Sequence, residues 1–459
     1  MKPEIFLSTK PNTSVHSYFF AAICMKHKIN NDILYYNCKL TKDLKISNIF
    51  TLLKVMLSGN FFNDYKFIKL KLNNCEIGRH VLSQVHSVFK TNNNYYLFFI
   101  HKVTNLLKGI MIISFLEENK KKIKIVYADQ GSYLNGIYFN FFKNRNIFIY
   151  SINHPRGFFG KNLKKEKKNL SVEDYLKVNK KNINVSNKEK NTLKKKLGVE
   201  GIKNVARRSY LPWMINKVYK KINIKNIDEY EYLIYGHAFT DAQYVFGYDG
   251  TFLSAYEWLE FTIDFLLKEN KKIIVKAHPN FNKFNKHFRS KYEVKLFNKI
   301  EKKFNNSKNV LFIADPIKNI EMLSLLNKKT ILVTHHGTPV IEGGFSKFKF
   351  ICSNQTYWSE KFRICNYWSN IEEYKKLLKS DYNMLKHSNT KDLFQLAKQV
   401  FFNNFNDFGN NFYVKKFEKF SGKNWINLMS KKNNLINYNP KIKKHKNFIY
   451  ELKKSIEII

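Results

Sequence analysis

Histidine follows an apolar run three times in the second half of this chain, each time beside small or turn-forming residues. The three stretches supply His237 and Asp241 in "YGHAFTDAQ", Lys276, His278 and Pro279 in "VKAHPN", and His335, His336, Gly337, Thr338 and Glu342 in "LVTHHGTPVIEGGF". Imidazole and ammonium groups are donors that suit phosphate oxygens. Taken singly, each stretch is also explained by a capped helix, a turn at proline or a capping aspartate. Packing does not explain three imidazoles that meet at one rim, whereas a site for a nucleotide mono- or diphosphate does.

The third stretch is typical of a strand that turns sharply into a helix. Gly337 permits a tight turn, Thr338 is a good N-cap residue, and Pro339 suits the first helical position. A helix that starts there points free backbone N–H groups and the positive end of its dipole outward, which favours an anion. Glu342 would lie one turn along the same helix, where a carboxylate suits sugar hydroxyls better than phosphate.

The elements that must position these residues alternate between strand and helix. Apolar runs predict strands at residues 232–239, 271–279, 309–315, 329–336 and 347–353, and helical patterns lie between them at 252–269, 282–305 and 318–327. Such alternation predicts parallel strands joined by crossover helices. Ligands of open α/β sheets bind beyond the carboxyl ends of the strands, which is where the histidines fall.

The first half of the chain has the same rhythm. Strands are predicted at 4–9, 33–38, 66–71, 95–100, 122–129 and 146–153, and helices at 14–27, 79–91 and 102–118. The helix at 79–91 carries Arg79, His80 and His86, which we expect on its surface, with contact to an acceptor as the alternative. The predicted fold is therefore α/β, with two Rossmann-like domains that face a central cleft and a helical C-terminal tail.

The predicted domain boundaries follow changes in composition. An N-terminal domain is expected at 1–158, a basic linker or excursion at 159–228, a C-terminal Rossmann-like domain at 229–385, and helices with a basic tail at 386–459. The linker contains "KKNINVSNKEKNTLKKK", which is typical of a solvated segment, and contact with lipid phosphates is the alternative. From about residue 355 onward the chain is predicted to be helical, including 389–405.

The chain has 459 residues, a formal net charge of +44, 44% hydrophobic and 16% aromatic residues, which excludes a disordered composition. The charge favours an anionic partner, or reflects a codon bias toward Lys, Asn, Ile, Phe and Tyr. Five cysteines without a CxxC pair argue against a zinc ribbon and a disulfide framework. No signal peptide is predicted, and the longest apolar stretch, "LLKGIMIISFL", is about half a bilayer span. We expect a cytoplasmic protein, associated at most peripherally with the inner face of an anionic membrane.

A resemblance to a known family rests on the ordered stretches "GHAFTDAQ…YEWLEFTIDFLLKENKKIIVKAHPN…VTHHGTPVIEGG", over roughly residues 230–345. They resemble bacterial capsule and surface-polysaccharide biosynthesis glycosyltransferases of the GT-B type. The first half is similar only through "YADQGSYLNG" at 127–136. The resemblance implies that the second domain holds a nucleotide-sugar donor. By position, the donor contacts would come from Lys276, His278, Pro279, His335, His336, Gly337 and Thr338, with Glu342 on ribose or sugar hydroxyls. The continuation "PVIEGGF" departs from the small residues that are usual in the family at this point.

The acceptor side is expected in the first domain. An inverting transfer needs a base that takes the proton of the acceptor hydroxyl. Asp129 is the candidate, with Asp241 and His237 as alternatives, although an aspartate there could simply form a turn. His16 and Tyr133 are expected to contact the acceptor.

The sequence thus predicts a glycosyltransferase that moves a sugar from a nucleotide sugar to a capsule, lipopolysaccharide or other surface-glycan acceptor. A CMP-activated acid sugar is one option for the donor. We expect no cofactor and no bound metal, because no HExxH or Cys/His spacing is present. A nucleotide-sugar epimerase or a glycerophosphotransferase of the same fold is the first alternative. A basic nucleic-acid-binding protein is the second, although no binding module or Walker A loop supports it and no nucleic acid is expected as a partner.

Overall fold

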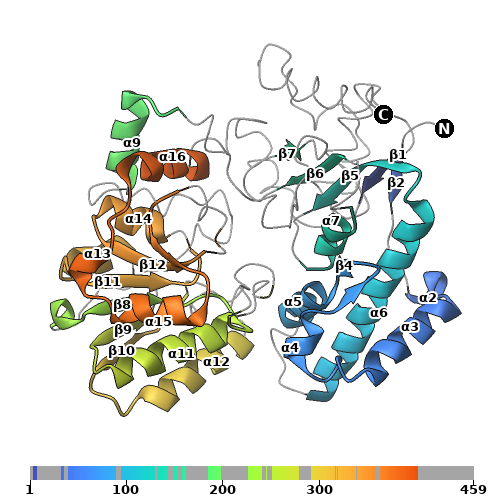
Figure 1. Cartoon of the computed structure of the whole chain (residues 1–459), viewed down its shortest axis with the longest axis horizontal. Helices are drawn as coiled ribbons and strands as arrows, with labels where there is room; N and C mark the ends of the chain where they lie inside the picture. Colours follow the sequence, from blue (N-terminus) through green and yellow to red (C-terminus); the bar gives the residue numbers. More distant parts are fainter. Residues whose placement is uncertain are drawn as a thin grey trace, which may run out of the picture. The chain divides into compact units, whose positions relative to one another are not determined.

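The computed structural model describes residues 4–7, 33–35, 40–88, 95–129, 133–142, 148–152, 158–161, 184–197, 226–239, 244, 251–278, 291–315, 317, 319–337, 339–354, 356 and 362–401. The chain divides into two compact units. The described elements of the first unit run from β1 to β7. Those of the second unit are α9 and the elements from β8 to α16 (Figure 1).

A parallel six-stranded sheet forms the centre of the second unit. Its strands lie in the order β10-β9-β8-β11-β12-β13, and every neighbouring pair is parallel. Their bounds are β8 Tyr232–Tyr235, β9 Ile273–Lys276, β10 Val310–Ile313, β11 Ile331–Thr334, β12 Lys349–Ser353 and β13 Asn366–Trp368. This is a Rossmann-type order, and the predicted strand–helix alternation is confirmed for this unit. β13 lies where the sequence predicted only helix, so that prediction is wrong there.

Helices cover both faces of this sheet. The helices are α11 (Ala255–Lys268), α12 (Lys291–Phe304), α13 (Asn319–Leu325), α14 (Pro339–Phe345), α15 (Ile371–Lys379) and α16 (Thr390–Phe401). In Figure 1, α11 and α12 lie below the sheet and α14 lies above it. The Ser254 side chain caps α11 by accepting from the backbone N–H of Glu257. Trp258 of α11 is fully buried and its Nε1 donates to the Tyr374 hydroxyl of α15 at 2.9 Å. The core therefore fills the space between the sheet and α11, α12 and α15.

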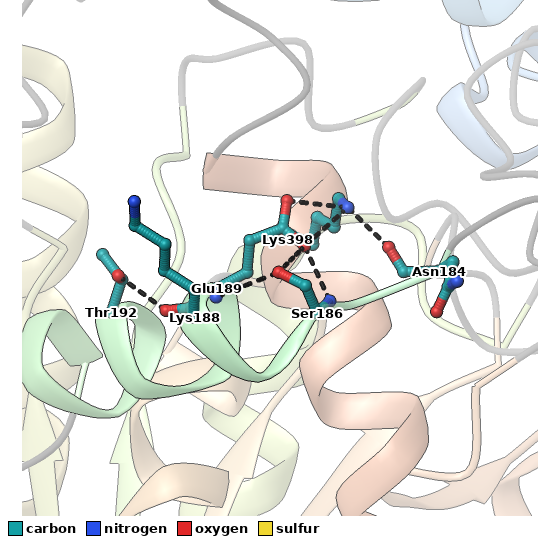
Figure 2. A network of polar contacts seen from close by, with 6 residues as sticks. All are labelled: Asn184, Ser186, Lys188, Glu189, Thr192 and Lys398. Atoms are coloured by element: carbon teal, nitrogen blue, oxygen red, sulfur yellow. Dashed lines mark hydrogen bonds and ion pairs between the residues drawn. The ribbon is translucent and has the colours of Figure 1, made fainter.

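A helix forms inside the lysine-rich segment for which the sequence predicted no element. α9 (Asn187–Leu197) begins with a capping box, in which Ser186 and Glu189 satisfy each other's backbone N–H groups. Lys398 of α16 makes an ion pair with Glu189, which joins the two helices (Figure 2). Leu193 is fully buried. The apolar signal is two leucines, Leu193 and Leu197, among many lysines, which is too little to predict a docked helix.

The first unit has a five-stranded sheet in the order β2-β1-β5-β6-β7. The strands are β1 Glu4–Leu7, β2 Ile33–Tyr35, β5 Ile123–Asp129, β6 Phe148–Ile152 and β7 Phe158–Lys161. The first four are parallel, and β7 pairs with β6 in the antiparallel direction. α5 (Gly78–Val88) confirms the helix predicted at 79–91. The helix predicted at 14–27 lies outside the described residues. Three further helices are α2 (Leu40–Asp43), α3 (Ile46–Leu57) and α7 (Gly136–Phe142).

The strand predicted at 66–71 is wrong for most of its length. Asn63 caps a short helix, α4 (Asp64–Phe67), by accepting from the backbone N–H of Lys66. Only β3 (Lys71–Leu72) is extended, and it pairs with β4 (Cys75–Glu76) through a turn at Asn73 and Asn74, both with positive φ. Two left-handed asparagines define a hairpin turn, and that pair was the overlooked signal.

The strand predicted at 95–100 is also wrong, because these residues begin a 25-residue helix, α6 (Tyr95–Asn119). Aromatic residues favour strands weakly, and tertiary packing overrides that preference here. α6 is long and apolar enough to cross a membrane, with a mean hydropathy of 1.4 in its most apolar window, but 44% of that window is buried inside the protein. Gly109 approaches Val81 of α5 and Ile137 of α7, so α6 serves as a core helix of this unit.

Candidate functional site

The three histidine-bearing strand ends meet at one edge of the second sheet, as the sequence predicted. β8 pairs with β9 on one side and with β11 on the other, all in the parallel direction. The ring centroids of His237 and His336 are 3.8 Å apart, and those of His237 and His278 are 5.7 Å apart. Each of these histidines is the second residue after the end of its strand. The three residues therefore lie equally far beyond the carboxyl ends of their strands.

The meeting point is the place where the chain reverses its direction across the sheet. From β8 the chain proceeds to β9 and β10 on one side, and then returns through α13 to β11 on the other side. Open α/β sheets bind ligands at this switch point, beyond the carboxyl ends of the two strands involved. His237 follows β8 and His336 follows β11, so the closest pair of rings stands at the switch point.

His335 holds His336 in place. His335 is buried, and its ring packs edge-on against Trp258 and Trp368, with centroids at 5.6 and 5.5 Å. Its carbonyl accepts from the Ser353 backbone N–H at 3.0 Å. Its Nδ1 lies 3.0 Å from Nδ1 of His336, so one of the two nitrogens carries the proton between them. His335 therefore holds the ring of its neighbour in a fixed orientation.

His336 is neutral at physiological pH. Burial lowers its pKa well below the usual value, and the neighbouring imidazoles of His237, His335 and His278 lower it further. Its Nε2 is buried and has no hydrogen-bond partner among the described residues. A buried polar atom without a partner is rare in proteins and often marks a place that a ligand or a water completes. Nδ1 of His237, by contrast, lies 3.1 Å from the Ala238 carbonyl and must donate to it, because a carbonyl only accepts.

A second set of polar contacts involves the residues that end β8 and β9. The hydroxyl of Tyr235 donates to Oδ1 of Asn319 at 2.7 Å, and Nδ2 of Asn319 donates to a carboxylate oxygen of Glu342 at 2.6 Å. Lys276, the last residue of β9, is buried with Nζ 5.9 Å from the centroid of the Tyr235 ring. Burial and the charge of Glu342 raise the pKa of Tyr235 well above its usual value. Sequence reasoning missed Asn319 and Tyr235, although Asn319 lies in the helix predicted at 318–327 and Tyr235 in the strand predicted at 232–239.

Glycine shapes the strand–helix turn that follows β11. α14 begins at Pro339, as predicted. A Cβ on Gly337 would lie 3.3 Å from Oγ1 of Thr334, so the turn is tight. In α14 itself, a Cβ on Gly343 would lie 2.3 Å from the Phe350 ring, so glycine permits this helix to pack closely on β12. α14 has only seven residues, and the case for an anion at this rim rests on the side chains rather than on its dipole.

The other residues predicted for the site are less completely placed. His16, Asp241, Pro279 and Thr338 lie outside the described residues. The backbone of Asp129 is the last position of β5, paired with Ile152 of β6, and its side chain lies outside what the structure describes. Tyr133 begins a 3-10 turn, η1 (Tyr133–Asn135), with a φ of 56° and a half-buried side chain. The roles predicted for these residues stay predictions.

His80 departs from the surface position that the sequence predicted. It is fully buried in α5, and Nε2 lies 2.7 Å from Nδ2 of Asn140. The pKa of His80 is lowered to about 3, chiefly by burial and also by the charge of Arg79, while a hydrogen bond with the Tyr133 backbone opposes the shift. The helical pattern alone did not show which face of α5 is covered. His80 is a core residue of the first unit.

Among the described residues, no group of three His, Cys, Asp or Glu side chains is arranged to hold a metal ion.

No family model and no curated protein sequence matches this chain. It has distant similarity to the solved structure of a UDP-GlcNAc 2-epimerase from Methanocaldococcus jannaschii in complex with UDP-GlcNAc and UDP, with 14% identity over 87% of this chain and 99% of that chain and a TM-score of 0.29. KpsC from Thermosulfurimonas dismutans, a beta Kdo 2,4 transferase, is 13% identical over 61% and 81% of the two chains, with a TM-score of 0.37. A glycosyltransferase from Rickettsia africae is 12% identical over 94% and 99%, with a TM-score of 0.26. Identity and TM-score are low in all three cases, so the function proposed below rests on the site itself.

Proposed function

We propose that the second unit binds the phosphate of a nucleotide sugar at the histidine rim, meaning His237, His278, His335 and His336 beyond the ends of β8, β9 and β11. We also propose that the protein is a glycosyltransferase. The observation that carries this proposal is the buried, unpartnered Nε2 of His336 at the switch point of a Rossmann-type sheet, among the residues that the structure describes. If Nδ1–H of His335 donates to Nδ1 of His336, the neutral tautomer of His336 presents Nε2–H as a donor. A phosphate oxygen is the acceptor that fits such a donor, with His278 and Lys276 adding charge-assisted contacts.

The chemistry that follows is a displacement at the anomeric carbon. The bond between that carbon and the phosphate oxygen of the leaving nucleotide breaks, and a bond to the acceptor oxygen forms. The departing phosphate gains negative charge, and hydrogen bonds from fixed donors in a site with little water stabilise that charge in the transition state. The proton of the acceptor hydroxyl passes to a base, for which Asp129 is our candidate, with Asp241 and His237 as alternatives. No step in this scheme requires a metal or a cofactor.

The finer assignments rest on the sequence. The ordered stretches around His237, His278 and His336 resemble capsule and surface-polysaccharide transferases of the GT-B type, which favours a surface-glycan or lipid-linked acceptor. We place Glu342 on ribose or sugar hydroxyls, because it lies about one turn into α14, beyond the strand–helix turn at Gly337. Asn319 also holds one of its carboxylate oxygens in a fixed position. A CMP-activated acid sugar is one option for the donor. The protein would work in the cytoplasm, at the inner face of the cell membrane.

A thermal-shift screen of CMP, UDP, GDP and their sugars tests the proposal. One nucleotide should raise the melting temperature by about 5 °C or more at a concentration a hundredfold above its Kd. The shift should be lost in His336→Asn and kept in His387→Ala, which replaces an exposed histidine of the same unit. Absence of a shift with every nucleotide, together with tight and steeply salt-dependent binding of single-stranded DNA, would support the nucleic-acid alternative instead.

Product analysis separates the enzyme classes that share this fold. A transferase releases free nucleotide only when an acceptor is present and moves the sugar to that acceptor. An epimerase changes the sugar without any acceptor, and a glycerophosphotransferase carries a phosphate group into the product. Either of the last two outcomes would keep the phosphate site and reject the transferase.

A further inference from the structure

The first unit exposes an unusual concentration of large apolar side chains. Twelve of the fourteen exposed large hydrophobic residues in the described parts of the chain fall between residues 44 and 100, and the other two, Leu325 and Met384, lie far along the second unit. Scattered apolar residues on a surface are ordinary, whereas a contiguous group marks a binding face. Nothing in the proposed reaction uses this group.

One part of the group is a stripe along α3. This helix buries Asn48, Leu52 and Val55 against the unit. Its opposite side exposes Ile46, Phe50, Leu53 and Leu57, at the i, i+4, i+7 and i+11 spacing of a single helical stripe. Phe50 and Leu57 are 67% and 86% exposed. α3 is therefore apolar on both sides, which is unexpected for a helix that meets only water on its outer side.

The second part is the tip where α3 ends and α6 begins. The ring of Phe62, in the turn after α3, stacks on that of Phe99 in α6 at 6.4 Å between centroids. Beside Phe99, the first turn of α6 exposes Tyr95 and Tyr96. Lys45 at the start of α3 makes an ion pair with Glu118 at the end of α6, so the two helices run antiparallel and their apolar ends meet at this tip.

The surroundings of the group are positively charged. From residue 44 to residue 71 the chain carries five lysines and one acidic residue, Asp64, which is paired with the buried Lys102. Lys54, Lys66 and Lys69 are exposed. Apolar side chains rimmed by lysines suit an anionic bilayer, because the former enter the acyl boundary and the latter meet lipid phosphates. Tyrosine at the tip fits the same environment, since its ring is apolar and its hydroxyl is polar.

We propose that the α3–α6 face, meaning the exposed residues of α3 together with Phe62, Tyr95, Tyr96 and Phe99, docks the protein onto an anionic membrane surface. A bilayer fits better than a second copy of this chain, because a twofold contact through this face would bring two lysine-rich rims together. The proposal depends only on these two helices and the turn after α3, and it stands independently of the proposed reaction.

The test is co-sedimentation of the full chain with vesicles. Wild-type protein should bind vesicles of phosphatidylglycerol and phosphatidylcholine and bind vesicles of phosphatidylcholine alone at least about tenfold more weakly, because each lysine near an anionic surface adds to affinity. Phe50→Glu with Leu57→Glu should lower partitioning to the anionic vesicles by about tenfold or more, since both side chains leave the apolar stripe. Leu325→Glu with Met384→Glu, at the exposed apolar positions of the second unit, is the matched control and should bind as the wild type does.

Three results would overturn the proposal. Equal sedimentation of the wild type and the α3 variant would show that this stripe does not enter the bilayer. Equal binding to neutral and anionic vesicles would remove the role of the lysines. A wild-type dimer that becomes a monomer in the α3 variant, without any binding to vesicles, would assign the face to a second copy. Circular dichroism spectra that match the wild type would confirm that the variant is folded, which is expected because both positions are exposed.

Discussion

The imidazole rings of His237 and His336 lie 3.8 Å apart between centroids, although they follow two different strands, β8 and β11. Two cationic imidazoles at this separation would repel each other, and the pKa of His336 is lowered well below its usual value in the free protein, which favours its neutral form. An anion placed against Nε2 of His336 reverses that balance, because its charge favours the protonated ring. The protonation of His336 should therefore change when a phosphate binds beside this pair.

Phosphate binding should therefore be linked to proton uptake. The pKa of His336 lies well below its usual value in the free protein, and a bound phosphate should raise it. Between the free and the bound pKa the complex holds more protons, so affinity for nucleotide should increase as the pH falls, by up to about tenfold per pH unit. Isothermal titration calorimetry in buffers of different ionisation enthalpy measures the protons taken up. An affinity that falls with falling pH in this range would contradict this account.

His335 should matter through its neighbour. His335→Phe keeps an aromatic ring between Trp258 and Trp368 but removes the Nδ1 partner of His336. We expect a loss of about 1–3 kcal/mol in the free energy of unfolding, because the buried Nδ1 of His336 is left without a partner. Nucleotide affinity should fall about tenfold, because the ring of His336 would no longer be held in the orientation that donates to the phosphate. If denaturation shows the loss of stability while affinity and its pH dependence stay unchanged, His335 serves packing alone.

His80 should make the first unit sensitive to acid. Its pKa is lowered to about 3 in the folded protein and returns to its ordinary value on unfolding. Between those two values the unfolded chain binds a proton that the folded chain does not, so stability should fall as the pH is lowered, by up to about 1.4 kcal/mol per pH unit. Urea denaturation as a function of pH measures this slope. His80→Gln should flatten it, and His101→Gln on α6 is the matched control; an unchanged slope in His80→Gln would show that another group is responsible.

The proposed base is tested by asking which step it affects. Asp129→Asn should lower turnover by two or more orders of magnitude, in line with the loss of general base catalysis (about 10²–10⁴-fold). Donor affinity, measured separately by calorimetry, should stay within a factor of about two of the wild type. If Asp129→Asn is active and Asp241→Asn is inactive, the base belongs to the second half of the chain.

Much of the histidine rim could be predicted from sequence because its signals are local. Each strand is an apolar run of a few residues, each histidine follows its strand closely, and parallel pairing brings such ends to one edge. The side-chain contacts between different helices and strands could not be predicted in the same way. The bond from Asn319 to Glu342 and the two tryptophans around His335 join residues that only the folded chain brings together.

The errors in the fold have equally physical causes. At 95–100 the aromatic run suggested a strand, but the apolar residues that continue to Leu116 gain more burial as one helix. At 66–71 the side chain of Asn63 starts a helical turn, which removes the first residues of the expected strand. In both places a cap or a packing partner, rather than the propensity of the segment, decided the structure.

The proposed phosphate site depends most on Nε2 of His336, and one comparison of two variants tests this atom directly. The variants His336→Gln and His336→Asn differ in which imidazole nitrogen the side-chain amide can replace, since glutamine reaches the Nε2 position and asparagine stops near Nδ1. Calorimetric titration of the preferred nucleotide should give an affinity within about tenfold of the wild type for His336→Gln. For His336→Asn we expect a loss of about a hundredfold, as when a hydrogen bond to a charged group is removed. Wild-type affinity in His336→Asn would show that the phosphate is held elsewhere.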